Sequence, residues 1–137
     1  MKLLDAIGRV ERDRPNEAGK DDLVAWINQL DMRFWTEQVR RHEGGDAVAA
    51  PDYSMDAAGD TELLIPSPWD EVYIHHLYAC IDYRLGEMDR YNNSAILFQN
   101  AWANACKAWR RTHMPLQTGT KHVIYGKRRG NPECILS

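Results

Sequence analysis

The chain lacks several features that would assign it to a protein class at once. It has no apolar run of about 18 residues, so the sequence predicts no transmembrane helix. Charges come early in Met1–Asp5 and no apolar stretch follows, which argues against a secretory signal peptide. The three cysteines, Cys80, Cys106 and Cys134, form no C-x-x-C pair. This argues against a disulfide framework or a thiolate zinc site and favours a reducing compartment.

Acidic residues are almost absent from the last third of the chain. Residues 90–137 hold eight Lys or Arg and one acid, Glu133, whereas residues 1–89 hold nine Lys or Arg and 19 Asp or Glu. The formal net charge of −3 therefore conceals an acidic part of −10 and a basic part of +7. Such asymmetry predicts different partners for the two ends. The alternative is that both parts are solvated and partly neutralise each other.

The residues that are present describe an ordinary globular chain. Its 137 residues fit one domain, and 44% hydrophobic with 27% charged residues are typical of a folded protein. Apolar residues at helical spacing predict four helices, over about residues 1–13, 21–42, 68–85 and 89–112. We expect Ser67 to cap the third helix and Gly86 to end it.

The fourth predicted helix has the strongest pattern. Its apolar stripe advances by four and three residues in turn, through Tyr91, Ala95, Phe98, Trp102, Ala105 and Trp109. The break at Gly86 is short enough to require an antiparallel hairpin with the third helix. The predicted fold is therefore mostly α, a small four-helix bundle.

Two segments fall outside this helical pattern. Residues 44–67 are rich in Ala, Gly and Asp and predict a long loop after the second helix, in which Leu63–Ile65 form either a short strand or a hydrophobic anchor. After Pro115 no helical pattern remains, and residues 120–125 favour a strand. We therefore expect a helical domain over residues 1–115 and an extended basic arm over residues 116–137.

The sequence offers no convincing site for chemistry. His75 and His76 are neighbours on a predicted helix and point about 100° apart, so they cannot hold one metal from the same face. Gly119 and Gly126 have six residues between them rather than the four of a phosphate-binding loop. No Ser-His-Asp arrangement is readable. We predict no catalytic, metal or cofactor site and expect that the protein is not an enzyme.

The C-terminal residues allow two other interpretations. Cys134–Ser137 match the C-a-a-X prenylation pattern, with basic residues 127–129 upstream, which would indicate a peripheral membrane protein in a eukaryotic cell. The same basic residues could bind nucleic acid electrostatically and without sequence preference. No helix-turn-helix or zinc-finger signature supports sequence reading.

A longer match lies within residues 1–115. Residues 63–115 resemble a family of small phage and prophage proteins, and two shorter stretches before them also fit. The longer segment reads LLIPSPWDEVYIHHLYACIDYRLGEMDRYNNSAILFQNAWANACKAWRRTHMP, and the shorter stretches are LLDAIGRVERDRPN and WINQLD. The tail from Leu116 is not covered. The matching residues are Pro66, Pro68, Asp70, Glu71, Tyr73, Ile81, Asp82, Gly86, Glu87, Arg90, Tyr91, Asn92, Asn93, Ser94, Phe98, Arg111, His113 and Pro115.

The resemblance implies a head–tail connector, or adaptor, of a long-tailed double-stranded DNA phage. Its members are expected to form a twelve-fold ring beneath the portal protein, to extend the DNA channel and to dock stopper or tail-completion proteins. The implied partners are other copies of the chain, the portal, a stopper or tail-completion protein and the passing genomic DNA, without a membrane. The implied location is the virion neck, after assembly in the host bacterial cytoplasm. Another neck role, stopper or tail completion, is the nearest alternative.

This role directs attention to polar residues at the predicted hairpin and in the arm. For Asn92 and Asn93, local hydrogen bonding near the helix start is the favoured interpretation, and a polar contact between subunits is the alternative. We expect Trp69 and Trp109 to lie in the core. The candidate partner-interface residues are Arg90, Asn92, Asn93, His113, Lys121, Tyr125, Lys127, Arg128 and Arg129.

Overall fold

The computed structural model describes residues 1–14, 18–55 and 61–116, and in these ranges it contains four α-helices and no strand. The helices are α1 (Leu3–Asp13), α2 (Lys20–Phe34), α3 (Glu71–Leu85) and α4 (Met88–Thr112). The prediction of a mostly helical fold with four helices is therefore confirmed. The strand predicted over residues 120–125 lies outside the described residues.

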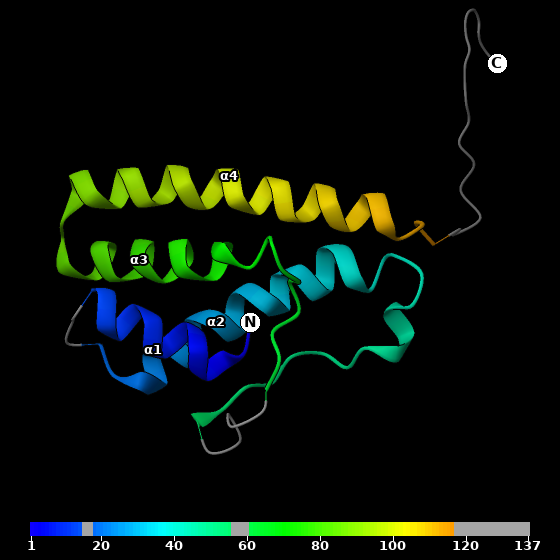
Figure 1. Ribbon diagram of the computed structural model, residues 1–137, viewed down its shortest axis with the longest axis horizontal. Helices are drawn as coiled ribbons and strands as arrows, with labels where there is room; N and C mark the ends of the chain where they lie inside the picture. Colours follow the sequence, from blue (N-terminus) through cyan, green and yellow to red (C-terminus); the bar gives the residue numbers. More distant parts are fainter. Residues whose placement is uncertain (15–17, 56–60, 117–137) are drawn as a thin grey trace, which may run out of the picture.

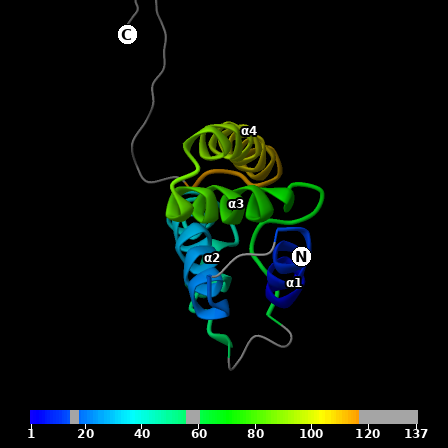
Figure 2. The same cartoon turned by 90° about the vertical axis from the view of Figure 1, so that its left-hand side faces the viewer.

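The helices lie in three layers with α3 in the middle (Figures 1 and 2). α1 and α2 lie side by side beneath α3, and α4 runs antiparallel to α3 along its other side. α4 has 25 residues and α3 has 15, so α4 is longer by about 15 Å and reaches past α3 to the end of α2. Among the described residues, no element covers the side of α4 that faces away from α3.

The hydrophobic core lies on both sides of α3. Its buried residues Val72, Tyr73, Ile74, Leu77 and Ile81 point in several directions around the helix, as expected for a helix covered on two sides. The partners from the other helices include Leu3, Ile7, Val10, Leu23, Ile27, Phe34, Trp102 and Ala105. Trp69 and Trp109 are half-buried and pack against this core, as predicted.

The end of the second helix departs from its predicted course. α2 does not continue as α-helix to His42, because Trp35–Val39 form a π-helical turn in which the Arg40 N–H donates to the Trp35 carbonyl at 2.9 Å. This wider turn lines up Phe34 and Val39, five residues apart, and both side chains are buried. The chain then turns at Gly44, whose φ of 83° is accessible to glycine at little cost.

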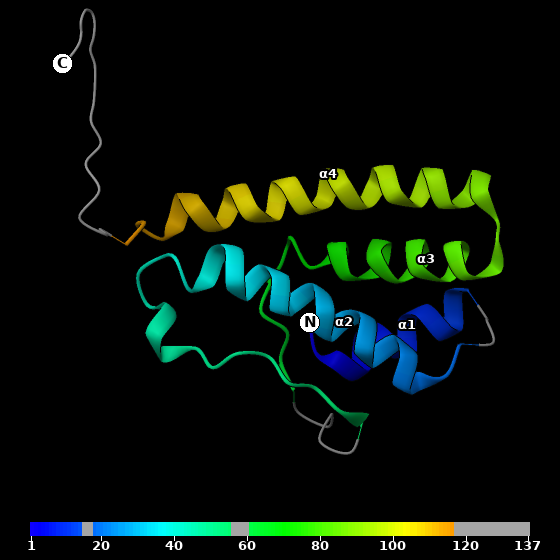
Figure 3. The same ribbon diagram turned by 180° about the vertical axis from the view of Figure 1, so that it is seen from behind.

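The described parts of the predicted long loop run beneath α2 (Figure 3) and are anchored to the bundle at several points. The Trp35 indole donates to the Val48 carbonyl at 3.0 Å, and the Tyr53 N–H donates to Asn28 Oδ1 at 3.1 Å. Farther along, Leu63 and Ile65 are buried in the core. Residues 63–65 are thus a hydrophobic anchor, the second of the two predicted possibilities.

The third helix begins later than predicted. Ser67 does not cap it, because its hydroxyl donates to Asp70 Oδ2 at 2.7 Å and a turn closes between the Trp69 N–H and the Pro66 carbonyl. α3 starts at Glu71 without a side-chain cap. Its predicted end is confirmed, since Gly86 adopts a φ of 75° and joins α3 to α4. In the described part of the chain, no helix is both long and apolar enough to cross a membrane.

Gly45 is expected to tolerate no side chain. A Cβ added there would lie 2.1 Å from the Val39 carbonyl oxygen, which the π-helical turn holds in place. We expect Gly45→Ala to lower the free energy of unfolding by about 2 kcal/mol or more, measured by urea denaturation. Gly8→Ala is the control, because nothing lies within 4 Å of its added Cβ. Inside α1 it should instead stabilise by about 0.5–1 kcal/mol, and equal losses for both variants would contradict the steric argument.

Candidate functional site

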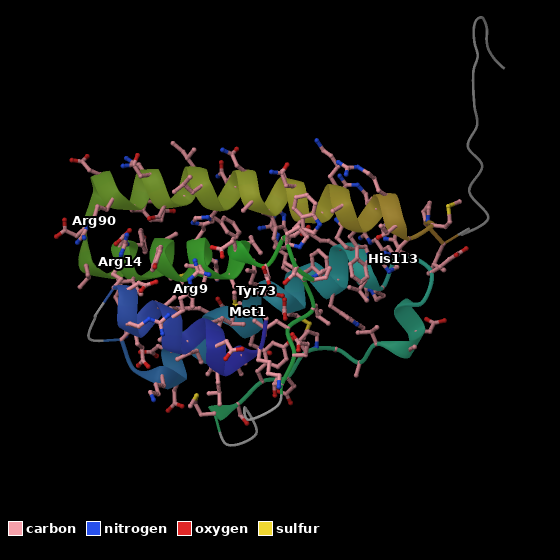
Figure 4. All side chains as sticks on the ribbon, viewed as in Figure 1. Met1, Arg9, Arg14, Tyr73, Arg90 and His113 are labelled. Atoms are coloured by element: carbon pink, nitrogen blue, oxygen red, sulfur yellow. The ribbon has the colours of Figure 1, made fainter. Side chains whose placement is uncertain are left out.

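The predicted interface residues that the structure describes lie at opposite ends of α4 (Figure 4). Arg90, Asn92 and Asn93 occupy its first turns, beside the α3–α4 connection, and His113 follows its last residue. At 1.5 Å per residue the two ends are separated by about 35 Å. The structure therefore does not bring these four residues into one site, and each end is a separate candidate surface.

At the hairpin end, the polar side chains face solvent. Arg90, Asn92 and Asn93 are all exposed, and within the described residues neither asparagine side chain makes a hydrogen bond. The residue that does bond is the next one, Ser94, which is buried and donates to Asp82 Oδ2 at 2.9 Å. The local hydrogen bonds considered for Asn92 and Asn93 are therefore not formed, and both amides are open to a partner.

At the far end, His113 makes contacts within its own chain. Its ring stacks on Trp109 with centroids 3.9 Å apart and planes 6° apart, and Nδ1 lies 2.9 Å from Thr112 Oγ1. The residues after His113 return to the chain that follows the π-helical turn. There the Glu43 N–H donates to the Met114 carbonyl, and the Leu116 N–H donates to the Arg41 carbonyl. His113 is thus half-buried, with part of its ring available to a partner.

The other predicted interface residues lie outside the described residues: Lys121, Tyr125, Lys127, Arg128 and Arg129. In the part of the chain that the structure describes, the lysines and arginines from Arg90 onward all lie on α4. Its last turns present Lys107, Arg110 and Arg111, all exposed. These three residues contribute to the charge asymmetry of the sequence, but none of them is among the interface residues predicted from it.

A shallow groove of about 310 Å³ lies between α3 and α4. His76, Cys80, Tyr83, Tyr91 and Phe98 line it, and Cys80 Sγ lies 3.7 Å from His76 Nε2. Burial raises the pKa of the Cys80 thiol to about 11 and lowers the pKa of His76. Near neutral pH the pair therefore holds a protonated thiol beside a neutral imidazole. It is not the thiolate–imidazolium pair of a cysteine nucleophile.

Two buried carboxyl groups, Asp31 and Asp82, hold segments together, and the sequence analysis gave neither a role, although Asp82 is among the residues of the resemblance. Asp31 accepts from the Tyr73 hydroxyl and the Tyr53 hydroxyl, at 2.5 Å each, and from the Leu64 N–H at 3.1 Å. Asp82 accepts from Arg14 and Ser94. Both side chains are fully buried and their partners are fixed, so they serve the fold and face no cavity open to a substrate.

Among the described residues, no group of three or more His, Cys, Asp or Glu is placed to hold a metal ion. Compared with protein-family models, curated proteins and solved structures, the chain matches none. The candidate site is therefore defined by the residues named in the sequence analysis and by their geometry. It comprises the hairpin end at Arg90, Asn92 and Asn93, the exposed length of α4, and its basic end.

Proposed function

We propose that the chain is a structural protein of a phage virion, a head–tail connector that forms a ring beneath the portal and docks stopper or tail-completion proteins. The observation that carries the proposal is the exposure of Arg90, Asn92 and Asn93 at the hairpin end. These residues belong to the segment that resembles phage neck proteins. A purely structural role does not explain them, because the two amides contribute no hydrogen bond to the described fold.

The shape of the α3–α4 hairpin supports this role. The hairpin ends in polar residues, and its longer helix carries Lys107, Arg110 and Arg111 toward the other end. A connector ring needs surfaces on each copy that contact the next copy and the proteins above and below. The polar hairpin end and the basic end supply two such surfaces on one rigid element.

The proposal predicts that the hairpin end is needed for assembly and not for folding. We expect full-length protein to form rings visible by electron microscopy, or to co-purify with the portal protein of the same phage. Arg90→Glu combined with Asn92→Asp should reduce this association by about tenfold or more while the unfolding transition stays in place. Arg12→Glu, an exposed charge on α1, is the control.

Two results would overturn the connector proposal. One is a monomer that neither assembles nor binds the portal and is absent from purified particles. The other is a gene position away from the genes that separate portal and capsid from tail. Localisation to a different level of the neck would instead assign the chain to stopper or tail completion.

A further inference from the structure

The outward face of α4 is unusual for a helix in contact with water. From Tyr91 to Cys106, a stretch of 16 residues, α4 contains no charged side chain. Ile96 is 57% exposed and Leu97 is 51% exposed on this face, and Asn100 lies on the next turn. Solvated helix faces normally carry many charged residues, whereas surfaces that bind proteins are depleted of charge at their centre.

Charges of opposite sign flank this neutral stretch. Asp89 lies in the first turn of α4, and Arg110 and Arg111 lie in its last turn. All three are exposed, and none forms an ion pair within the described residues. Steps of three and four residues place one stripe along the outward face. It runs through Asp89, Asn93, Ile96, Asn100, Ala103, Asn104, Lys107 and Arg111.

We propose that this stripe binds the same stripe of a second copy, with the two α4 helices antiparallel and a two-fold axis at Asn100. Asp89 of each copy then lies opposite Arg111 of the other, so the charge complementarity occurs twice. A parallel pairing would place like charges together and is disfavoured. Asn100 meets itself at the axis.

The side-chain sizes fit the same register. With Asn100 on the axis, Ile96 of one copy lies opposite Ala103 of the other, and Leu97 lies opposite Asn104. The large apolar side chains thus meet smaller ones, as close helix packing requires. The exposed apolar area at Ile96 and Leu97 becomes covered, which supplies the hydrophobic part of the binding free energy.

This pairing does not rest on the connector proposal. A two-fold contact is isologous and closes after two copies, whereas a ring needs a different, heterologous contact. Asn93, Lys107 and Arg111 lie on the stripe and contact the second copy in the pair, but Arg90 and Asn92, the residues that the connector test changes, lie beside the stripe and stay accessible. The two proposals therefore fail separately in experiment.

Cysteine crosslinking tests the axis directly. In a Cys134→Ser background of the full chain, Asn100→Cys should give a disulfide-linked dimer under copper–phenanthroline oxidation. Helices packed 8–10 Å apart bring self-facing Cα atoms to about 5 Å, within the range of a disulfide. Gln99→Cys is the matched control, because this exposed neighbour points about 100° away. No crosslink at residue 100, or equal crosslinking at both positions, would overturn the pairing.

Charge exchange tests the register. We expect Asp89→Arg and Arg111→Asp each to weaken the dimer about tenfold or more in sedimentation equilibrium, and the double variant to recover most of that loss. Ile96→Asp should abolish the dimer, whereas Leu85→Asp, which changes an exposed apolar residue on α3, should not.

Two results contradict the proposal. One is a wild type that stays monomeric at 100 µM, a concentration chosen well above a micromolar Kd. The other is a double variant that dimerises more weakly than both single variants. A wild-type chain that dimerises through this stripe, does not bind the portal and is absent from purified particles would leave the pairing standing and overturn only the connector.

Discussion

Replacing Asp31 with alanine is expected to destabilise the fold by about 3 kcal/mol, because buried donors are costly to leave without an acceptor. Asp31 is fully buried on α2 and accepts from Tyr73 on α3, from Tyr53 in the long loop and from the Leu64 N–H. The same Tyr73 hydroxyl accepts from the Ile65 N–H at 2.8 Å. One carboxyl group therefore ties the loop to two helices.

The loss is measured by urea denaturation with far-UV circular dichroism. Tyr53→Phe is the graded comparison, because it removes one half-buried hydrogen bond and leaves the other two donors paired with Asp31. We expect it to cost about 1 kcal/mol. If Asp31→Ala unfolds at the same urea concentration as wild type, the carboxyl group does not hold the loop.

Asp31 also predicts a dependence of stability on pH. Burial raises the pKa of Asp31 above its ordinary value of 3.8, although its bonds from Tyr53, Tyr73 and Leu64 act in the opposite direction. The folded chain then binds this proton more tightly than the unfolded chain. The contribution of Asp31 to the free energy of unfolding therefore falls as the pH rises from about 4 through the pKa that Asp31 has in the folded chain. At higher pH this contribution stays constant.

Asp31→Asn isolates this effect, because asparagine does not titrate and all other groups are shared with wild type. We expect the difference in unfolding free energy, wild type minus variant, to decrease with rising pH across that window and then to level off. The measurement is urea denaturation of both proteins at intervals from pH 4 to pH 8. A difference that grows with pH would mean that the pKa of Asp31 is lowered in the folded state.

Much of the fold could be predicted because its determinants are local. Apolar spacing marks each helix, and Gly86 leaves room only for a hairpin. The π-helical turn at Trp35–Val39 could not be foreseen, since it follows from the need to bury Phe34 and Val39 together against other helices. The start of α3 was missed because Ser67 bonds to Asp70 instead of to the helix, which is a choice between two local partners.

The functional surface was predictable only in part. Arg90, Asn92 and Asn93 were singled out by the resemblance, and their exposure follows from their position on α4. The neutral stripe through Asn100 is visible in the sequence as a stretch without charge. Its significance depends on α4 being the uncovered outer layer, which no local pattern reveals. Nothing in the sequence reveals that Asp31 and Asp82 are buried, because their partners are 12 to 68 residues away in the chain.

Removing Asp82 is expected to cost even more than removing Asp31, about 3–5 kcal/mol, because the Arg14 guanidinium would lose its buried counterion. Asp82 is fully buried on α3 and accepts from Arg14 Nη1 at 2.6 Å and from Ser94 Oγ at 2.9 Å. Arg14 also lies over the Tyr78 ring, 4.2 Å from its centroid. The carboxylate thus joins the end of α1 to α3 and to the start of α4.

A second Arg–Asp pair provides the matched control. Arg84 and Asp22 join α3 to α2 at 2.7 Å, almost the same distance, but their side chains are about half exposed. Arg84 lowers the pKa of Asp22, yet water screens the pair, and we expect Asp22→Ala to change stability far less than Asp82→Ala. Equal losses would show that burial does not set the strength of these pairs.

In a double-mutant cycle, Arg14→Ala and Asp82→Ala should be strongly non-additive, because once either partner is gone the bond between them is already lost. Additive losses would place the stabilisation in Tyr78 and Ser94 instead, and the end of α1 would then be held by packing rather than by charge.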